Sequence, residues 1–277
     1  MIRAVILSLL MASAAAAAER VFVAGGSGRS GIEMVKAFRA AGYDVTASTR
    51  DAAQAADRHG SDITWVRLDM FALPDVIAAV AGHDIVISAL GHGDFIGPEA
   101  PQFVQYLAVR NLIDAAKAAK AKHMLLMSSS TAGHRFDHRL EARFGMVLYW
   151  MTKAEDYLAA SGLGWTVLGP GGLYDAEILA LRGLPPPPAE DWGARIMPRP
   201  DYKFDFVSRA GVAQVALAAV RDPAARGKAV AIVWDREGRG AKVAGGFGAV
   251  AVEPATETYP NSIVPKPRRP GPVQMQR

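Results

Sequence analysis

The 277-residue chain contains no cysteine. This absence excludes disulfide bonds, thiolate nucleophiles, cysteine-based zinc sites and a lipid-modified cysteine anchor, and it is compatible with an oxidising compartment. The chain also lacks a cluster of basic residues. Its formal net charge is only +4, and its lysines and arginines are dispersed rather than interleaved with aromatic residues. Nucleic-acid binding is therefore not expected.

Long apolar runs are absent as well, because the apolar stretch after Arg3 is shorter than the ~20 residues that a spanning helix needs. This amino-terminal segment has one positive charge, then residues 4–11, which are almost wholly apolar, and then small residues ending in Ala16-Ala17-Ala18. That layout is typical of a secretory signal peptide, with cleavage expected before Glu19. No twin arginine is present, so export of a folded protein is not indicated. Residues 1–18 thus predict an exported or periplasmic protein with no membrane span after cleavage. The alternative is a misassigned start codon and a cytoplasmic protein that begins near Arg20.

The most informative positive feature is a glycine-rich segment that follows the apolar run Val21–Ala24 and precedes a helix-like stretch. Its sequence is Gly25-Gly26-Ser27-Gly28-Arg29-Ser30-Gly31, with the spacing G-x-x-G-x-x-G. A buried strand that breaks into such a turn and then a helix is the phosphate-binding entry of a Rossmann unit. The glycines permit close approach to a pyrophosphate, and the helix N-terminus holds the anion. We therefore predict that Gly25, Ser27, Gly28, Arg29, Ser30 and Gly31 bind a dinucleotide.

The rest of the chain alternates apolar strand patterns with helical ones up to about residue 173. Strands are expected at 45–49, 63–68, 84–90, 123–127 and 165–168, and helices at 32–42, from 76, at 103–121 and at 149–160. This alternation predicts an α/β fold, a doubly wound parallel sheet of the Rossmann type. After 173 the pattern predicts only a short strand at 204–207, a helix at 211–220 and a strand at 229–234. We expect residues 19–235 to form one domain with a small carboxyl-terminal substrate region, and residues 236–277 to form a Gly/Pro-rich, largely disordered tail.

Arg50 ends the second expected strand, where a Rossmann fold contacts the adenosine ribose. An acidic residue there would bind the ribose hydroxyl of NAD, whereas an arginine suits the 2′-phosphate of NADP. Arg29 adds a second positive charge nearby. The sequence favours NADP over NAD as the cofactor.

Tyr149 and Lys153 are four residues apart, so a helix would place both side chains on one face. The lysine ammonium is expected to lower the tyrosine pKa and so favour proton transfer. Ser128-Ser129-Ser130 follows a strand at the carboxyl edge of the sheet, where α/β folds bind ligands. One serine hydroxyl could contact a substrate carbonyl and the tyrosine, while at least one of the three is expected to bond the strand-end backbone.

These features occur in an order that resembles the short-chain dehydrogenase/reductase proteins, with closest likeness to their atypical, NmrA-like NAD(P)-binding branch, over roughly residues 20 to 234. The segment Ser161-Gly162-Leu163 and the Pro170-Gly171-Gly172 turn belong to the same likeness. The resemblance implies that Asp69 and Met70 lie near the adenine and that Ala89, Leu90 and Gly91 line the cofactor. It further implies that Pro170 flanks the nicotinamide, that Ser130, Tyr149 and Lys153 are the catalytic set, and that Lys153 also binds the nicotinamide ribose. The chain departs from the family at Gly169, where an arginine is common.

The leading hypothesis is an NADP-dependent oxidoreductase that transfers hydride to or from a small carbonyl, quinone or flavin-like substrate. A non-catalytic dinucleotide-binding redox sensor is the alternative, because fold does not settle activity. A nucleotide-sugar epimerase or dehydratase is a third interpretation. No metal site is expected, since His134 and His138 lack the glutamate of a zincin motif and a third ligand.

Overall fold

The computed structural model describes residues 18–133, 143–174, 180, 183, 193–235 and 243–251. Elements up to residue 127 are β1 (Arg20–Ala24), α1 (Arg29–Ala40), β2 (Asp44–Thr49), α2 (Ala52–His59), β3 (Thr64–Arg67), α3 (Leu73–Val80), β4 (Ile85–Ser88), the π-helix η1 (Gln102–Ala108), α4 (Val109–Ala118) and β5 (His123–Met127). The later elements are α6 (Val147–Ala159), β6 (Trp165–Pro170), β7 (Gly172–Tyr174), β8 (Ala194–Met197), η2 (Arg199–Asp201), β9 (Phe206–Ser208), α8 (Arg209–Arg221), η3 (Pro223–Ala225), β10 (Lys228–Trp234), β11 (Val243–Ala244) and η4 (Phe247–Ala249).

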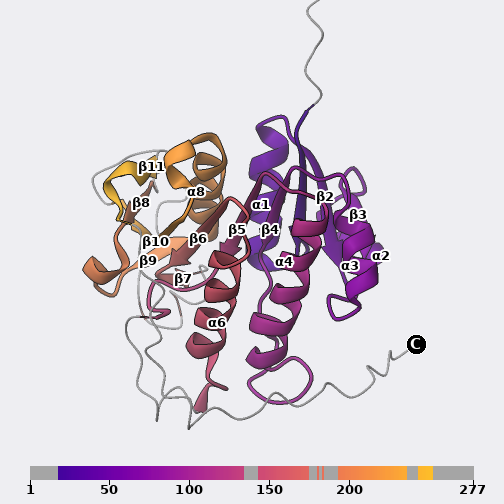
Figure 1. Cartoon of the computed structure of the whole chain (residues 1–277), viewed down its shortest axis with the longest axis horizontal. Coiled ribbons are helices and arrows are strands. Elements are labelled where there is room, and N and C mark those ends of the chain that lie inside the picture. Colours follow the sequence, from indigo (N-terminus) through magenta and orange to yellow (C-terminus); the bar gives the residue numbers. More distant parts are fainter. Residues whose placement is uncertain are drawn as a thin grey trace, which may run out of the picture.

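A nine-stranded sheet runs through the molecule in the order β11-β8-β10-β6-β5-β4-β1-β2-β3 (Figure 1). Every neighbouring pair is parallel except β8 and β10, which are antiparallel. From β1 the chain winds outward through β2 to β3, and it then returns to β4 on the other side of β1. This reversal is the doubly wound Rossmann order, so the predicted fold class is confirmed. Strands β7 and β9 form a separate parallel pair.

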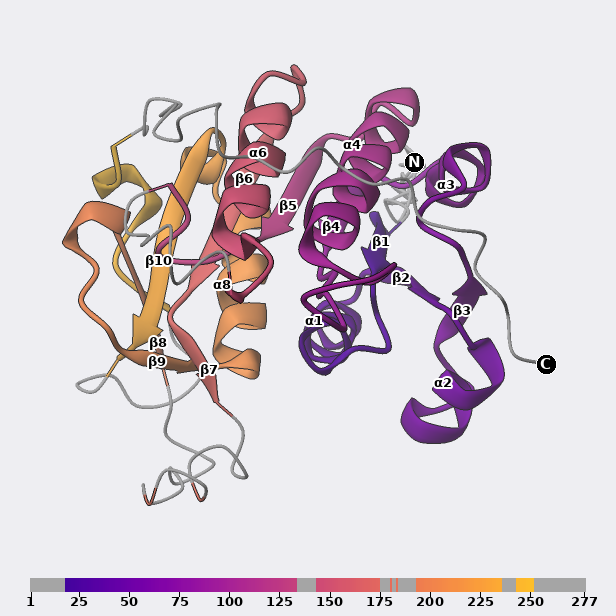
Figure 2. The ribbon, with the colours of Figure 1, turned by 90° about the horizontal axis from the view of Figure 1, so that it is seen from below.

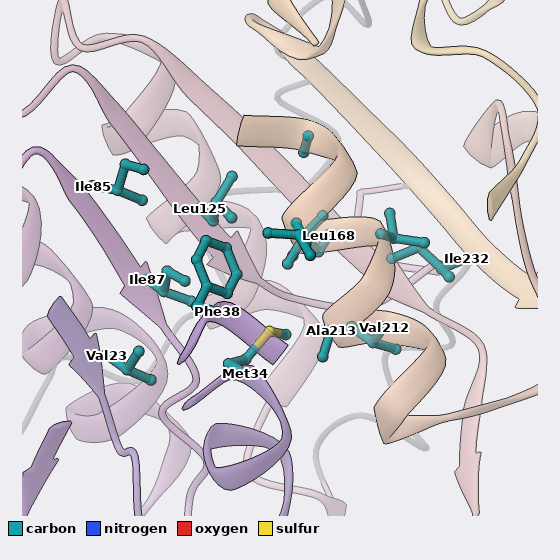
Figure 3. Close-up of a cluster of buried hydrophobic side chains, with 14 of the residues drawn as sticks. Val23, Met34, Phe38, Ile85, Ile87, Leu125, Leu168, Val212, Ala213 and Ile232 are labelled. Atoms are coloured by element: carbon teal, nitrogen blue, oxygen red, sulfur yellow. The ribbon is translucent and has the colours of Figure 1, made fainter. Parts of the chain in front are cut away.

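Helices cover both faces of the sheet (Figure 2), and the sheet separates two clusters of buried hydrophobic side chains, which form two layers. Helices α1 and α8 pack against each other on one face, while α4 contacts both α3 and α6 on the other. Successive residues of a strand point to opposite faces. Val23 of β1 accordingly joins Met34, Phe38 and Val212 in the first layer (Figure 3), and Phe22 belongs to the second.

Several elements differ from the sequence prediction. The long helix expected over 103–121 begins as a π-helix and becomes α-helical only at Val109. Strands β7, β8 and β11 were not predicted, and they are only two to four residues long. Part of the expected tail is ordered, because β11 pairs with β8 and Phe247 is buried in the core. Residues 1–17, His134, His138 and residues 252–277 lie outside the described part of the chain.

Within the described ranges, no helix combines the length and the hydropathy needed to cross a membrane.

Candidate cofactor and active site

The glycine-rich loop joins β1 to α1 at the carboxyl edge of the sheet, and its geometry requires glycine. Gly25 has a φ of +75°, and the Gly28 N–H donates to the Gly25 carbonyl at 3.0 Å. A Cβ on Gly31 would lie 2.1 Å from the Gly25 oxygen, and one on Gly26 would lie 2.6 Å from the Ala47 Cβ. No side chain caps the N-terminus of α1. The loop therefore presents closely approachable backbone and the positive end of a helix dipole, which suit a pyrophosphate.

The loop lies where the strand order reverses between β1 and β4, the position at which open α/β sheets bind ligands. A Cβ on Gly25 would lie 3.0 Å from the Ala89 oxygen and 3.3 Å from a Leu90 methyl group. Gly91 follows them, and a Cβ there would meet nothing within 4 Å. The structure thus places the loop beside the predicted residues Ala89 and Leu90, with open space at Gly91.

The residues predicted to contact adenosine follow the ends of β2 and β3. Ser27 and Thr49 share a hydrogen bond of 2.9 Å between their hydroxyls, which links the glycine loop to β2. Asp69 accepts from the Phe71 N–H at 3.0 Å, and Asn111 of α4 donates to the Met70 carbonyl at 3.0 Å. Asn111 was not predicted from the sequence. The helical spacing of the sequence indicates that Asn111 is an interior residue, but it does not indicate that Asn111 binds the Met70 carbonyl.

Arg50 lies directly after β2, as predicted, and its side chain is 81% exposed. Its guanidinium forms an ion pair and a hydrogen bond with Glu99. Glu99 belongs to the segment between β4 and η1, and no sequence motif pointed to it. Asp51, the next residue after Arg50, caps α2 by accepting from the Gln54 N–H at 3.0 Å. That carboxylate therefore caps the N-terminus of α2.

The three serines after β5 differ in their partners. Ser128 donates to the carboxylate of Glu155, and the Ser129 and Thr131 hydroxyls lie 3.0 Å apart. Ser130 is buried, and its N–H donates to the Pro170 carbonyl at 3.0 Å. The structure thus brings Ser130 beside Pro170 at the carboxyl edge, where both were expected.

Tyr149 and Lys153 lie on one face of α6, as their spacing predicts. The Lys153 Nζ is 5.7 Å from the centroid of the Tyr149 ring, a cation–π distance. Tyr149 is buried and packs edge-on against Trp150, whose ring also contacts Tyr106. Burial, followed by the charges of Tyr106 and Asp156, raises the pKa of Tyr149. The expected lowering of this pKa by Lys153 is therefore wrong for this geometry, because desolvation disfavours the phenolate.

A buried ion pair holds α6 against the carboxyl-terminal region. The Arg199 side chain is 1% exposed, and its guanidinium donates to Glu155 at 2.8 Å and to the Ala132 carbonyl at 2.9 Å. Because Ser128 binds the same carboxylate, Glu155 joins the end of β5, α6 and η2. These residues fix the helix that carries Tyr149 and Lys153. No sequence motif signals this pair, since its members are far apart in the chain.

The glycine loop, the strand order and the uncapped helix together describe a dinucleotide site, and comparison with known proteins agrees. The profile of the NAD(P)H-binding family matches residues 25–223. The chain belongs to this NAD(P)H-binding family. The match begins at the first glycine of the loop and ends just after α8.

The proteins that the chain resembles in sequence vary in length and name. The chain is 26% identical over 234 residues to the NAD(P)H azoreductase of Xenophilus azovorans, covering 84% of this chain and 74% of that protein. It is 31% identical over 173 residues to the chloroplastic protein TIC 62 of rice (Oryza sativa), covering 55% of this chain but only 35% of that protein. This chain therefore matches about a third of the length of the rice protein.

Among solved structures, the anaerobillin reductase ChuY of Escherichia coli O157:H7 has a TM-score of 0.61 and 23% identity, covering 78% of this chain and 98% of that one. At this identity the likeness supports the shared fold.

Proposed function

We propose that the protein is an NADP(H)-dependent oxidoreductase that acts on a planar carbonyl, quinone or flavin-like substrate. The observation that carries this proposal is the exposed guanidinium of Arg50 at the end of β2, beside a glycine loop that leads into an uncapped helix. An arginine at this position suits a 2′-phosphate, and the helix N-terminus suits the pyrophosphate.

The residues beside the site favour a flat substrate. Phe95 contacts both His92 and Phe144 at ring-centroid distances of 5.2 and 5.3 Å. Phe95 and Phe144 are each 40% exposed, so aromatic surface remains available for stacking. The relative named for azoreductase activity is consistent with an extended aromatic substrate.

In this proposal, each group of the chain has a distinct role. A bound nicotinamide dinucleotide supplies or accepts the hydride. The Tyr149 hydroxyl, which its raised pKa keeps protonated at neutral pH, donates a proton during reduction to the oxygen of a carbonyl or quinone, or to a ring nitrogen of a flavin-like substrate. Ser130, held beside Pro170 by its backbone hydrogen bond, orients that atom. Lys153 binds the nicotinamide ribose and contacts the tyrosine ring.

Thermal unfolding with NADPH and with NADH tests the cofactor assignment, and a panel of quinones, flavins and azo compounds then tests the reaction. We expect a larger rise in melting temperature with NADPH, and turnover that falls by about 10²-fold or more in Tyr149→Phe. If neither dinucleotide changes the melting temperature, dinucleotide binding is wrong. If turnover is the same in wild type and Tyr149→Phe, the role of Tyr149 as the acid is wrong.

The burial of Tyr149 supports a second candidate, a dinucleotide-binding redox sensor without turnover. This candidate predicts equally strong NADPH binding but no oxidation of NADPH with any member of the substrate panel. Assays that follow NADPH absorbance therefore separate the two functions.

A further inference from the structure

We propose that Glu99 is a cofactor-specificity residue, because it competes with the 2′-phosphate of NADP for the guanidinium of Arg50. This inference rests on the proposed function, in which Arg50 binds that phosphate. Glu99 lies outside both the glycine loop and β2. In this inference, Glu99 weakens NADP binding and leaves NAD binding unchanged.

Arg50 is exposed and forms an ion pair that a ligand can replace. Arg50 follows β2, and its side chain is 81% exposed, so the guanidinium is accessible to a ligand in solution. Its ion-pair partner in the structure is Glu99, whose side chain is 43% exposed. An exposed pair of this kind is weak, so a phosphate can replace the carboxylate.

The Glu99 carboxylate lies between the Arg50 guanidinium and the backbone of Gly93. A Cβ on Gly93 would lie 1.9 Å from the Glu99 Oε2, so the carboxylate lies close to the backbone of its own loop. The same segment is held farther along by Phe95, whose ring contacts Phe144 and whose carbonyl approaches Gly145. Residues 91–101, which we call the β4–η1 loop, thus contact Arg50 through Glu99 and the turn before α6 through Phe95.

The chemistry of the two cofactors gives the selectivity. The 2′-phosphate of NADP is an anion that needs the guanidinium and is repelled by a nearby carboxylate. The 2′-hydroxyl of NAD is neutral, so it neither requires Arg50 nor suffers this repulsion. Replacing Glu99 with an amide of the same shape therefore removes a competitor for NADP alone.

Isothermal titration with NADP⁺ and NAD⁺, and with the fragments 2′,5′-ADP and 5′-AMP, tests the inference on wild type, Glu99→Gln and Arg50→Gln. We expect Glu99→Gln to bind NADP⁺ and 2′,5′-ADP about threefold to fivefold more tightly, in line with the strength of an exposed ion pair, with NAD⁺ and 5′-AMP unchanged. The gain should shrink at high salt, because salt screens exposed charges.

Asp62→Asn is the matched control, since Asp62 also forms an exposed carboxylate–arginine pair, with Arg39 at 2.7 Å. Asp62 comes just before β3, at the amino edge of the parallel sheet, whereas Arg50 follows β2 at the carboxyl edge. Asp62→Asn should change neither affinity. An equal gain in Asp62→Asn would mean that net charge alone is responsible and would overturn the inference.

The remaining outcomes separate the inference from the proposed function. If Arg50→Gln selectively weakens 2′-phosphate ligands while Glu99→Gln leaves them unchanged, the role of Glu99 is wrong and the NADP assignment stands. If Arg50→Gln weakens NADP⁺ and NAD⁺ equally or not at all, the assignment of Arg50 to the 2′-phosphate fails, and the inference fails with it.

Discussion

His123 is a buried histidine at the start of β5, and the structure keeps it neutral. Its Nε2 lies 2.9 Å from the Thr166 hydroxyl, which itself donates to the Ala225 carbonyl at 2.7 Å. Nε2 is therefore the protonated nitrogen, because the threonine proton is already used. Within the described residues, Nδ1 is buried without a hydrogen-bond partner. Burial, with a smaller effect of Arg226, lowers the pKa of His123 to about 4.

This lowered pKa predicts a loss of stability in acid. The neutral histidine contributes its stabilisation fully above the unfolded-state pKa of about 6.5, and loses it as the pH falls toward 4. The free energy of unfolding should fall by about 3 kcal/mol across this interval through His123 alone. Urea denaturation at several pH values should show a shallower pH dependence in His123→Gln. The same dependence in both proteins would contradict the assignment.

The Glu155–Arg199 pair acts between elements, because it joins α6 and η2 in a nearly dry environment. Glu155→Gln would remove the carboxylate that pairs with the buried Arg199 guanidinium. We expect a loss of about 3–5 kcal/mol in the free energy of unfolding. The double variant Glu155→Gln/Arg199→Met should recover much of it, since the buried guanidinium is then gone as well. Urea denaturation measures both, and equal losses in the single and double variants would exclude this explanation.

Alanine substitutions at two glycines near the sheet edge, Gly31 and Gly91, are expected to differ in their effect on stability. In Gly31→Ala the new methyl group meets the Gly25 carbonyl, so stability should fall by about 1–3 kcal/mol, although alanine normally favours a helix. In Gly91→Ala the methyl group enters open space, so stability should hold within about 0.5 kcal/mol. Dinucleotide affinity should nevertheless fall by about tenfold or more, because the family resemblance implies that Gly91 lines the cofactor. Unaltered dinucleotide affinity in Gly91→Ala would mean that Gly91 does not line the cofactor.

Local sequence patterns predicted those parts of the fold that depend on neighbours in the chain. The sequence pattern predicts a strand before the loop Gly25–Gly31 and a helix after it, and the structure contains both. The raised pKa of Tyr149 could not be predicted, because it depends on burial beside Tyr106, from another helix. The ion pair of Glu99 with Arg50 could not be predicted either. No residue type or spacing indicates an ion pair between a strand end and a distant loop.

At the scale of the whole molecule, the segment 243–251 forms the edge of the sheet next to β8. Strand β11 pairs with β8, and the Lys228 ammonium donates to the Val250 carbonyl. Phe247 is 3% exposed in the first core layer, whereas Phe204 is 71% exposed. This segment therefore belongs to the folded domain.

Phenylalanine truncation tests that conclusion with a built-in control. Phe247→Ala should lower the free energy of unfolding by about 3–5 kcal/mol, because it leaves a cavity. Phe204→Ala should change it by no more than about 0.5 kcal/mol. Thermal and urea denaturation of both variants provide the comparison. Similar effects of the two substitutions would mean that 243–251 does not anchor the sheet edge.

The packing of α1 on α8 has a consequence for the order in which the protein becomes functional. Met34 and Phe38 of α1 share their core layer with Val212 of α8, which is made much later in synthesis (Figure 3). Chains emerge from the ribosome amino terminus first, and contacts between distant segments form late. The glycine loop is thus among the first parts to be translated, yet its helix gains a full set of neighbours only after α8 has emerged. We expect nascent chains that end before α8 to bind dinucleotide poorly, so that cofactor capture marks the completion of the domain.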